Sequence, residues 1–223
     1  KYSQMIRSQQ GLAGAGEWET LRKLLPDFKD KRVLDLGCGY GWHCIYAMEH
    51  GASSVVGVDI SHKMLEVAKE KTHFPQVEYK CCAIEDVEFP EESFDVILSS
   101  LAFHYVADYE ILVKKIYRIL KSGGKLVFTV EHPVFTAYGT QDWYYNEKGE
   151  ILHFPVDNYY YEGKRTAVFL GEKVTKFHRT LTTYLNTLLS NGFIINHIVE
   201  PQPPEYMMDI PGMQDEMRRP MML

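Results

Sequence analysis

The sequence has little cysteine, no long apolar run and no surplus of positive charge. Its four cysteines show no Cys-x-x-Cys spacing and no paired cysteine and histidine set, so no metal site is expected. They are Cys38, Cys44, Cys81 and Cys82, and we expect reduced thiols in the core. No apolar run approaches the roughly 18 residues of a membrane span, and no signal-peptide pattern is present. We therefore expect a cytoplasmic protein without membrane contact.

Acidic residues outnumber basic ones in the chain. The 30 aspartates and glutamates exceed the 24 lysines and arginines and give a formal net charge of -6. Because nucleic-acid affinity comes largely from clustered Lys and Arg, we expect neither DNA nor RNA as a partner. The densest basic group, within 114–125, falls on and just after a predicted amphipathic helix, where it forms a solvated face. The length of 223 residues suits one domain, acting as a monomer or a homodimer.

Segments typical of strands and of helices alternate along most of the chain. This pattern predicts an α/β fold with a doubly wound, mainly parallel sheet and helices on both faces. Five short apolar segments bounded by turn residues are the predicted strands: 32–36, 55–58, 77–81, 96–99 and 125–130. The predicted helices span 17–25, 42–50, 61–71, 108–120 and 180–190, and the fourth is expected to end at Gly123 and Gly124. A sixth strand is predicted over 193–200.

A glycine-rich turn directly follows the first predicted strand. Residues 33–41 read Val-Leu-Asp-Leu-Gly-Cys-Gly-Tyr-Gly and precede a predicted helix. Glycines allow a sharp turn and let a ligand approach the backbone beside the free N–H groups of that helix. A nicotinamide dinucleotide also uses such a turn, with an acidic residue about 20 positions on, which Asp59 satisfies. However, Trp42 stands where its third glycine would be, and Asp35 suits an ammonium better than a phosphate, so an amino-acid-bearing nucleoside is favoured.

This loop resembles the first motif of the class I S-adenosylmethionine-dependent methyltransferases, especially the small-molecule group of type 11. The resemblance covers 31–130 and implies a Rossmann-like fold, with S-adenosyl-L-methionine as cofactor and S-adenosyl-L-homocysteine as product. It implies that the methionine part is wrapped by Asp35, Gly37, Cys38, Gly39, Gly41 and Trp42. Asp59 is implied to bind the ribose hydroxyls, with Ile60 and Met64 flanking the adenine.

Two further segments resemble the same family. Residues 83–95 match its adenine loop, which assigns Ala83, Ile84 and Glu85 to the edge of the base. Many members have Asp where this chain has Ala83, so the backbone there or the Glu85 side chain would have to read the adenine. Ser99 and Ser100 end the fourth predicted strand, where the family's chain leads into the acceptor site.

The resemblance implies methyl transfer to a small-molecule acceptor by in-line displacement, with O, N or C as the accepting atom. Positioning supplies most of the acceleration, and a base is useful only if that atom carries a proton. His104, Tyr105 and His132 are the candidates for such a base. Two alternatives remain: a non-catalytic S-adenosylmethionine-binding module and an NAD-dependent dehydrogenase.

One methyltransferase domain is expected over 1–223. Its parts are an N-terminal helical cap (1–30), a cofactor-binding core (31–131), an insertion (132–178) and a C-terminal helix with strands (179–223). The insertion is too aromatic for a flexible tether, and 146–149 predicts a hairpin turn. Its Trp143, Tyr144 and Tyr145 are expected to form an acceptor lid, a satellite core or a dimer contact. Residues 10–18 either fold over the cofactor or fray.

Overall fold

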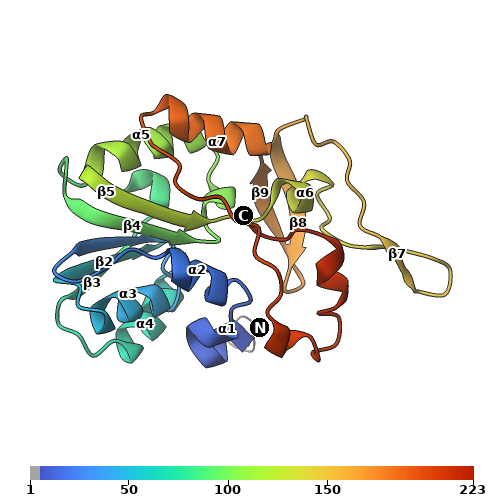
Figure 1. Ribbon diagram of the computed structural model, residues 1–223, viewed down its shortest axis with the longest axis horizontal. Helices are drawn as coiled ribbons and strands as arrows, with labels where there is room; N and C mark the ends of the chain where they lie inside the picture. Colours follow the sequence, from blue (N-terminus) through green and yellow to red (C-terminus); the bar gives the residue numbers. More distant parts are fainter. Residues whose placement is uncertain (1–5) are drawn as a thin grey trace.

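A five-stranded parallel sheet forms the centre of the computed structural model, which describes residues 6–223 (Figure 1). The strands are β1 (Arg32–Leu36), β2 (Ser54–Asp59), β3 (Val77–Cys81), β4 (Phe94–Ser100) and β5 (Leu120–Thr129). Their order is β3-β2-β1-β4-β5, and every neighbouring pair is parallel. The winding direction therefore switches between β1 and β4, which is where open α/β sheets bind ligands. The first five residues of the predicted N-terminal cap lie outside the described part.

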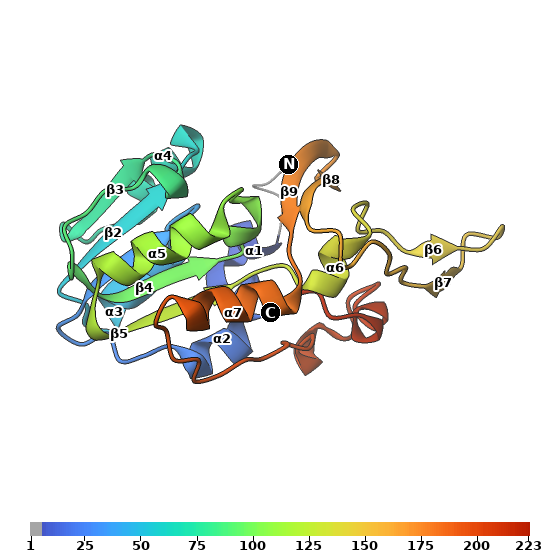
Figure 2. The ribbon, with the colours of Figure 1, turned by 90° about the horizontal axis from the view of Figure 1, so that it is seen from above.

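Helices cover both faces of the sheet. The helices α3 (Trp42–Glu49) and α4 (His62–Lys71) lie on one face, and α5 (Tyr109–Ile119) and α7 (Leu181–Ser190) lie on the other (Figures 1 and 2). The N-cap residues of α4, α5 and α7 are Ser61, Asp108 and Thr180. The side chain of each accepts the backbone N–H of the residue three positions further along the chain. The N-terminal cap consists of α1 (Ile6–Gln10), η2 (Gly11–Gly14) and α2 (Trp18–Leu24). It docks on α3 through Trp18, whose ring lies 4.8 Å from that of Tyr46.

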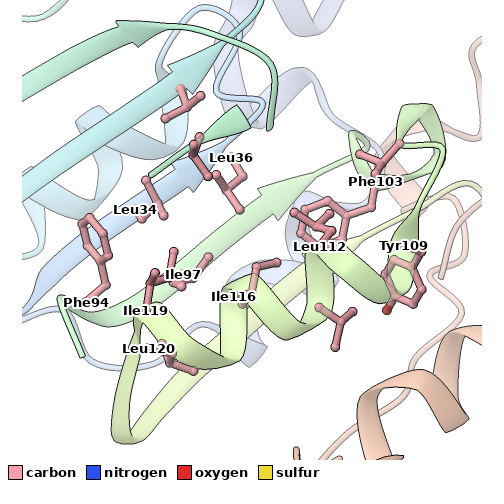
Figure 3. Close-up of a cluster of buried hydrophobic side chains, with 14 of the residues drawn as sticks. Leu34, Leu36, Phe94, Ile97, Phe103, Tyr109, Leu112, Ile116, Ile119 and Leu120 are labelled. Atoms are coloured by element: carbon pink, nitrogen blue, oxygen red, sulfur yellow. The ribbon is translucent and has the colours of Figure 1, made fainter. Parts of the chain in front are cut away.

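The core is divided by the sheet into two layers. Under α5, Leu34 and Ile97 pack against Leu112 and Ile116, and all four side chains are at most 1% exposed (Figure 3). Val33, the neighbour of Leu34, points to the opposite face and joins the cluster under α3. The inner strands β1, β2 and β4 are buried on both faces and therefore need nearly continuous apolar runs, which explains why these three segments were recognisable in the sequence. Truncating one of these leucines to alanine would cost about 2–5 kcal/mol.

The insertion contains α6 (Pro133–Ala137) and two antiparallel hairpins, β6 (Tyr144–Tyr145) with β7 (Ile151–His153) and β8 (Gly163–Phe169) with β9 (Glu172–His178). The predicted turn at 146–149 is present: Asn146 Oδ1 accepts the N–H groups of Lys148 and Glu150. The β6–β7 hairpin projects away from the rest of the molecule (Figure 2). The β8–β9 hairpin instead packs beside the η4 turn (Phe103–Tyr105) that follows β4.

Helix α5 agrees with the predicted span 108–120 to within one residue at each end, but Gly123 and Gly124 do not terminate it, and β5 begins earlier than predicted. The helix stops at Ile119 because Leu120 already pairs with Phe94 of β4. The register then shifts before Lys125, and Gly123 takes a φ of +74° within this irregular part of β5. The two glycines therefore serve a bulged strand instead of a helix terminus.

The sixth strand predicted over 193–200 is wrong, since these residues pair with no strand. Phe193 and Ile195 are partly buried against the core while Ile194 is 85% exposed, so exposure alternates over 193–195 without a backbone ladder, and residues 196–200 are all exposed. The chain beyond β5 pairs instead with the C-terminal residues, as Val130 and Leu223 exchange both backbone hydrogen bonds. Alternation in a sequence reports which side chains face the core and not whether the backbone is paired.

The cysteines are not all in the core. Cys38 and Cys44 are buried as expected, but Cys81 is exposed at the end of β3 and Cys82 is half-buried. Cys82 still packs against the core cluster under α5, whereas Cys81 is the last residue of the edge strand β3 and its Sγ donates to Ile60 O at 3.6 Å. Among residues 6–223 no helix is both long and apolar enough to cross a membrane.

Candidate active site

A cavity of about 550 Å³ opens at the carboxyl ends of β1, β2 and β4. The glycine loop after β1, the turn after β2, the η3 turn (Ile84–Asp86) and η4 form most of its wall. Leu12 of η2 contributes another part, so the segment 10–18 does reach this cavity. Phe169, at the end of β8, brings the insertion into the wall as well.

A larger hollow, of about 1060 Å³, lies along β5 and away from the glycine loop. Residues of α2, β5, α7 and the segment 192–199 line it, mostly with apolar side chains. The smaller cavity contains the loop and the titratable groups described below, so we place the functional site there.

The glycine loop is held open by its own backbone. Gly37, Gly39 and Gly41 have φ values of +81°, +53° and +75°, a conformation that side-chain-bearing residues rarely adopt. The N–H groups of Gly37 and Cys38 both donate to Val58 O, at 2.8 and 2.9 Å, which ties the loop to the end of β2. A Cβ on Gly37 would lie 2.5 Å from the Ala102 Cβ. The glycine pattern therefore reflects steric need at this end of the sheet.

Asp59 joins the loop to the turn after β2. Its Oδ2 accepts the Gly39 N–H at 2.9 Å, and its Oδ1 accepts the Ser61 N–H at 2.8 Å. The carboxylate lies in the cavity wall, and each of its oxygens has a further lone pair to offer a ligand. Asp59 therefore lies at the strand end, as the sequence predicts, and its carboxylate can accept hydrogen bonds from a ligand in the cavity.

The predicted adenine-binding residues surround one part of the cavity. Ile60, Met64, Ala83, Ile84 and Glu85 all line it. Ile60 is 73% exposed although it is a large apolar side chain, as expected of a wall that a ligand covers. The Cys82 N–H donates to Asp59 O at 3.2 Å, which fixes the chain leading to Ala83 beside the turn after β2.

Three predicted cofactor residues, Asp35, Gly41 and Ser99, do not line the cavity. Asp35 is 1% exposed beneath the loop, where its Oδ2 accepts the Cys44 thiol at 3.4 Å. Burial raises the pKa of that thiol well above its usual value, which keeps it a donor. Ser99 is also buried, and its Oγ donates to Leu36 O at 2.8 Å. Ser100, by contrast, lines the cavity.

Three predicted cofactor residues complete the loop. Cys38 and Trp42 line the cavity together with Gly39. Trp42 begins α3, and its buried indole N–H has no hydrogen-bond partner among residues 6–223.

The candidate bases His104 and Tyr105 both lie in the wall, next to each other in η4. Their rings are 4.4 Å apart, with His104 2% exposed and Tyr105 40% exposed. Burial lowers the pKa of His104 to about 4, against the opposing effect of Glu131. The imidazole is therefore neutral near pH 7.

The third candidate base, His132, does not reach the cavity. Its Nδ1 accepts the Val134 N–H at 3.1 Å at the start of α6, and its Nε2 lies 2.8 Å from Glu200 Oε1. Burial lowers its pKa, and Glu200 acts in the opposite direction. This geometry ties the segment 193–200 to α6.

The preceding residue, Glu131, lies in the wall beside His104, and sequence reasoning missed it as a site residue. Its Oε1 accepts a hydrogen bond from the ammonium of Lys176 in β9, and its Oε2 accepts one from Gln141 at 2.6 Å. Lys176 also donates to the Gln141 Oε1 at 2.8 Å and is 2% exposed. The one available signal was the Glu-His-Pro turn after the fifth predicted strand, and nothing local to Lys176 sets it apart from neighbouring lysines.

The wall fits the cofactor that the sequence resemblance implies. The Asp59 carboxylate suits a ribose diol, and Ile60, Met64 and Ile84 offer apolar contact to a planar base. At the other end of the loop, Trp42 occupies the position where a dinucleotide would require a glycine. The described residues contain no cluster of three or more side chains suited to a metal ion.

Comparison with known proteins agrees with this fit. The family described as a methyltransferase domain, of type 11, matches residues 34–128. A solved structure from Listeria monocytogenes, assigned as an S-adenosylmethionine-dependent methyltransferase, is 58% identical, with a TM-score of 0.91 over 95% of this chain and 96% of that one. An S-adenosylmethionine-dependent methyltransferase from Mesorhizobium loti is 40% identical, with a TM-score of 0.87 over 95% and 97%.

A curated relative from Haemophilus influenzae is 37% identical over 83% of this chain and 76% of its own. A Coxiella burnetii ubiquinone biosynthesis O-methyltransferase is 36% identical, but the match spans 49% of this chain and about half, 47%, of that protein. Since the two solved structures are matched over nearly their whole length, the chain belongs to the class I S-adenosylmethionine-dependent methyltransferases, with their Rossmann-like fold and S-adenosylmethionine as its cofactor.

Proposed function

We propose that this methyltransferase acts on a small-molecule acceptor that enters the cavity between η4 and the β8–β9 hairpin. The observation that carries the proposal is that Phe169 of β8 and Tyr105 of η4 both line this cavity of about 550 Å³. A concave cavity of this volume suits a small compound better than a folded macromolecule. The net charge of -6 further disfavours nucleic acid.

The same wall residues would hold the cofactor. Asp59 would bind the ribose, Ile60, Met64 and Ile84 would enclose the adenine, and the glycine loop would follow the methionine part. Glu85 and the backbone of Ala83 would face the edge of the base. Bound S-adenosylmethionine supplies an electrophilic methyl group on a sulfonium. The chain's own contribution is to hold the acceptor in line and to exclude water.

The β8–β9 hairpin, rather than the β6–β7 hairpin, would form the acceptor lid within the proposed insertion. Tyr144 and Tyr145 are 56% and 42% exposed on β6, and neither lines the cavity. Trp143 packs instead against Phe154, with ring centroids 5.5 Å apart, and under the Arg219 guanidinium at 4.2 Å. These contacts support the satellite-core interpretation for Trp143.

Replacing Asp59 by alanine tests the cofactor assignment. Affinity for S-adenosylhomocysteine should fall by at least about 1.5–3 kcal/mol, the range for a hydrogen bond to a charged group. Calorimetry measures this directly, and circular dichroism checks the fold. Asp95→Ala is the matched control, because Asp95 also accepts a backbone N–H, from Arg32, but at the opposite end of the sheet.

Unchanged affinity in a folded Asp59→Ala variant would contradict the assignment, as would an equal loss in Asp95→Ala. Tight binding of NADH by the wild type would favour the dehydrogenase alternative instead. Methyl release measured over a panel of metabolites then separates a catalyst from a binding module and addresses the acceptor.

A further inference from the structure

His104 and Glu131 present a matched pair of polar atoms to the acceptor end of the cavity. His104 follows β4 and Glu131 follows β5, so adjacent parallel strands deliver both to one edge of the sheet. Both residues line the cavity, and His104 Nε2 lies 3.9 Å from Glu131 Oε1. That separation is too long for a direct hydrogen bond and leaves room for one bridging atom.

The tautomer of His104 is set by the backbone. The Glu131 N–H, which can only donate, points at His104 Nδ1 at 3.3 Å. Nδ1 is therefore the unprotonated nitrogen, and the neutral ring carries its hydrogen on Nε2. The charged groups that act on the ring are Glu131, Lys176 and Arg179. Glu131 raises the pKa of His104, whereas burial, the largest effect, and the two cations lower it, so the ring stays neutral. His104 thus offers the cavity a donor and has no free lone pair with which to act as a base.

Glu131 offers the complementary acceptor. Its two oxygens receive hydrogen bonds from the Lys176 ammonium and the Gln141 amide, an arrangement typical of an ionised carboxylate. Lys176 is itself buried, so the pair is fixed in place. Each carboxylate oxygen still has a lone pair available.

A hydroxyl group is the chemical match to this pair, because it accepts one hydrogen bond and donates another. A carboxylate would be repelled by Glu131, and an ammonium would meet the His104 N–H and the charge of Lys176. An oxygen placed about 2.8 Å from both Nε2 and Oε1 fits within their 3.9 Å separation. Tyr105 and Phe169 supply aromatic surface beside it.

We propose that the acceptor presents a neutral hydroxyl group, whose oxygen receives the His104 Nε2–H and whose proton is directed at Glu131, so that this methyltransferase is specific for hydroxyl acceptors. The inference rests on the proposed function of the cavity. His104 then binds and orients the acceptor, while Glu131 receives the hydroxyl hydrogen bond.

Three ring compounds of one size test the chemistry on protein saturated with S-adenosylhomocysteine: benzyl alcohol, benzoate and benzylamine. Calorimetry should show benzyl alcohol binding about tenfold more tightly than either charged probe, the factor expected from one or two net hydrogen bonds. A preference for benzoate or benzylamine, or no preference, including no binding by any probe, would overturn the proposal.

Two variants of His104 distinguish its role as a hydrogen-bond donor from a role in side-chain packing alone. His104→Gln keeps an N–H donor and should retain the preference for benzyl alcohol, whereas His104→Leu should lose it. His73→Gln, at an exposed histidine, is the matched control and should bind all probes as the wild type does. Equal preferences in the Gln and Leu variants would show that His104 acts only as a packing residue.

The tautomer has an independent readout. In ¹⁵N-labelled protein, the long-range ¹H–¹⁵N spectrum of His104, identified by its loss in His104→Gln, should show the Nε2–H form unchanged from pH 6 to 8. An Nδ1–H form, or a titration in this range, would overturn the proposal. Binding of S-adenosylhomocysteine is measured on the same samples, so a failure of the proposed function is seen separately as loss of that binding.

Discussion

Replacing Lys176 by methionine should destabilise the protein because the Glu131 carboxylate loses its counterion. The Lys176 side chain is 3% exposed, and its ammonium donates to Glu131 and Gln141. Methionine fills much of the same volume, so little packing is lost. The variant leaves the Glu131 carboxylate, 15% exposed, with Gln141 as its one remaining donor among these side chains.

The expected magnitude follows from that burial. Removing one partner of a buried ion pair costs about 3–5 kcal/mol, and the partial access of Glu131 to the cavity places this case near 3 kcal/mol. Glu131→Gln should cost a similar amount, because it leaves a buried ammonium without its counterion. The double variant Glu131→Gln/Lys176→Met contains no buried charge at this position and should lose only about 1–2 kcal/mol.

Urea unfolding of the four proteins, followed by tryptophan fluorescence and circular dichroism, measures this cycle. The double variant should be more stable than either single variant. Additive losses, near 6 kcal/mol in total, would refute the reasoning, since they would mean that the two side chains contribute independently. The double variant also provides a folded protein without the carboxylate, in which the preference for benzyl alcohol should be absent.

The remaining predictions concern pH and the insertion. Since the pKa of His104 falls from 6.5 to about 4 on folding, the unfolded chain binds more protons between these values, so stability is present above pH 6.5 and is lost as the pH falls toward 4. Between pH 6.5 and pH 4 the free energy of unfolding, measured with urea, should fall by about 3 kcal/mol more in the wild type than in His104→Gln. An equal fall in both proteins would contradict the inference that burial lowers the pKa of His104. Trp143→Ala should lower stability by about 2 kcal/mol through its contacts with Phe154 and Arg219, whereas Tyr144→Ala should change it by less than about 0.5 kcal/mol. Thermal unfolding compares the two, and reversed sizes would assign the satellite core to the wrong hairpin.

The cofactor half of the site was predictable because its signals are local. Gly37, Gly39 and Gly41 follow β1 within five residues, and their positive φ values are a steric requirement that the sequence records directly. Asp59 is the last residue of β2, and the rule that parallel strands end at one edge places it beside that loop. Buried parallel strands also produce continuous apolar runs, so the order of elements could be followed along the chain.

The acceptor half was harder to predict because its partners are distant in sequence. Glu131 and Lys176 are 45 positions apart in the sequence, with α6 and most of two hairpins between them, and a lysine in a strand usually indicates a solvent-facing position. The sequence places His104 at the end of β4, and it does line the cavity, but the backbone N–H that fixes its tautomer comes from another strand end. The role expected for it, as a base, depended on a long-range hydrogen bond that no local pattern contains.

Partners that are distant in sequence also explain the two errors at the β5 edge of the sheet, which are the predicted strand over 193–200 and the late start predicted for β5. The apolar residues in 193–200 resemble a strand, yet the chain after β5 continues into Val130, whose backbone partner is Leu223 and not a residue of that segment. The glycines at 123 and 124 resembled a helix terminus because both helix ends and bulges use the same backbone freedom.

The pairing of Val130 with Leu223 divides the walls of the cavity into two kinds. The strands β1, β2 and β4 and the turns that follow them lie within residues 32–105, so the glycine loop and Asp59 are held by neighbours that are close in the chain. Glu131 instead belongs to a stretch whose backbone partners are residues 221–223. A change in the 221–223 segment should therefore displace Glu131 and leave the glycine loop in place.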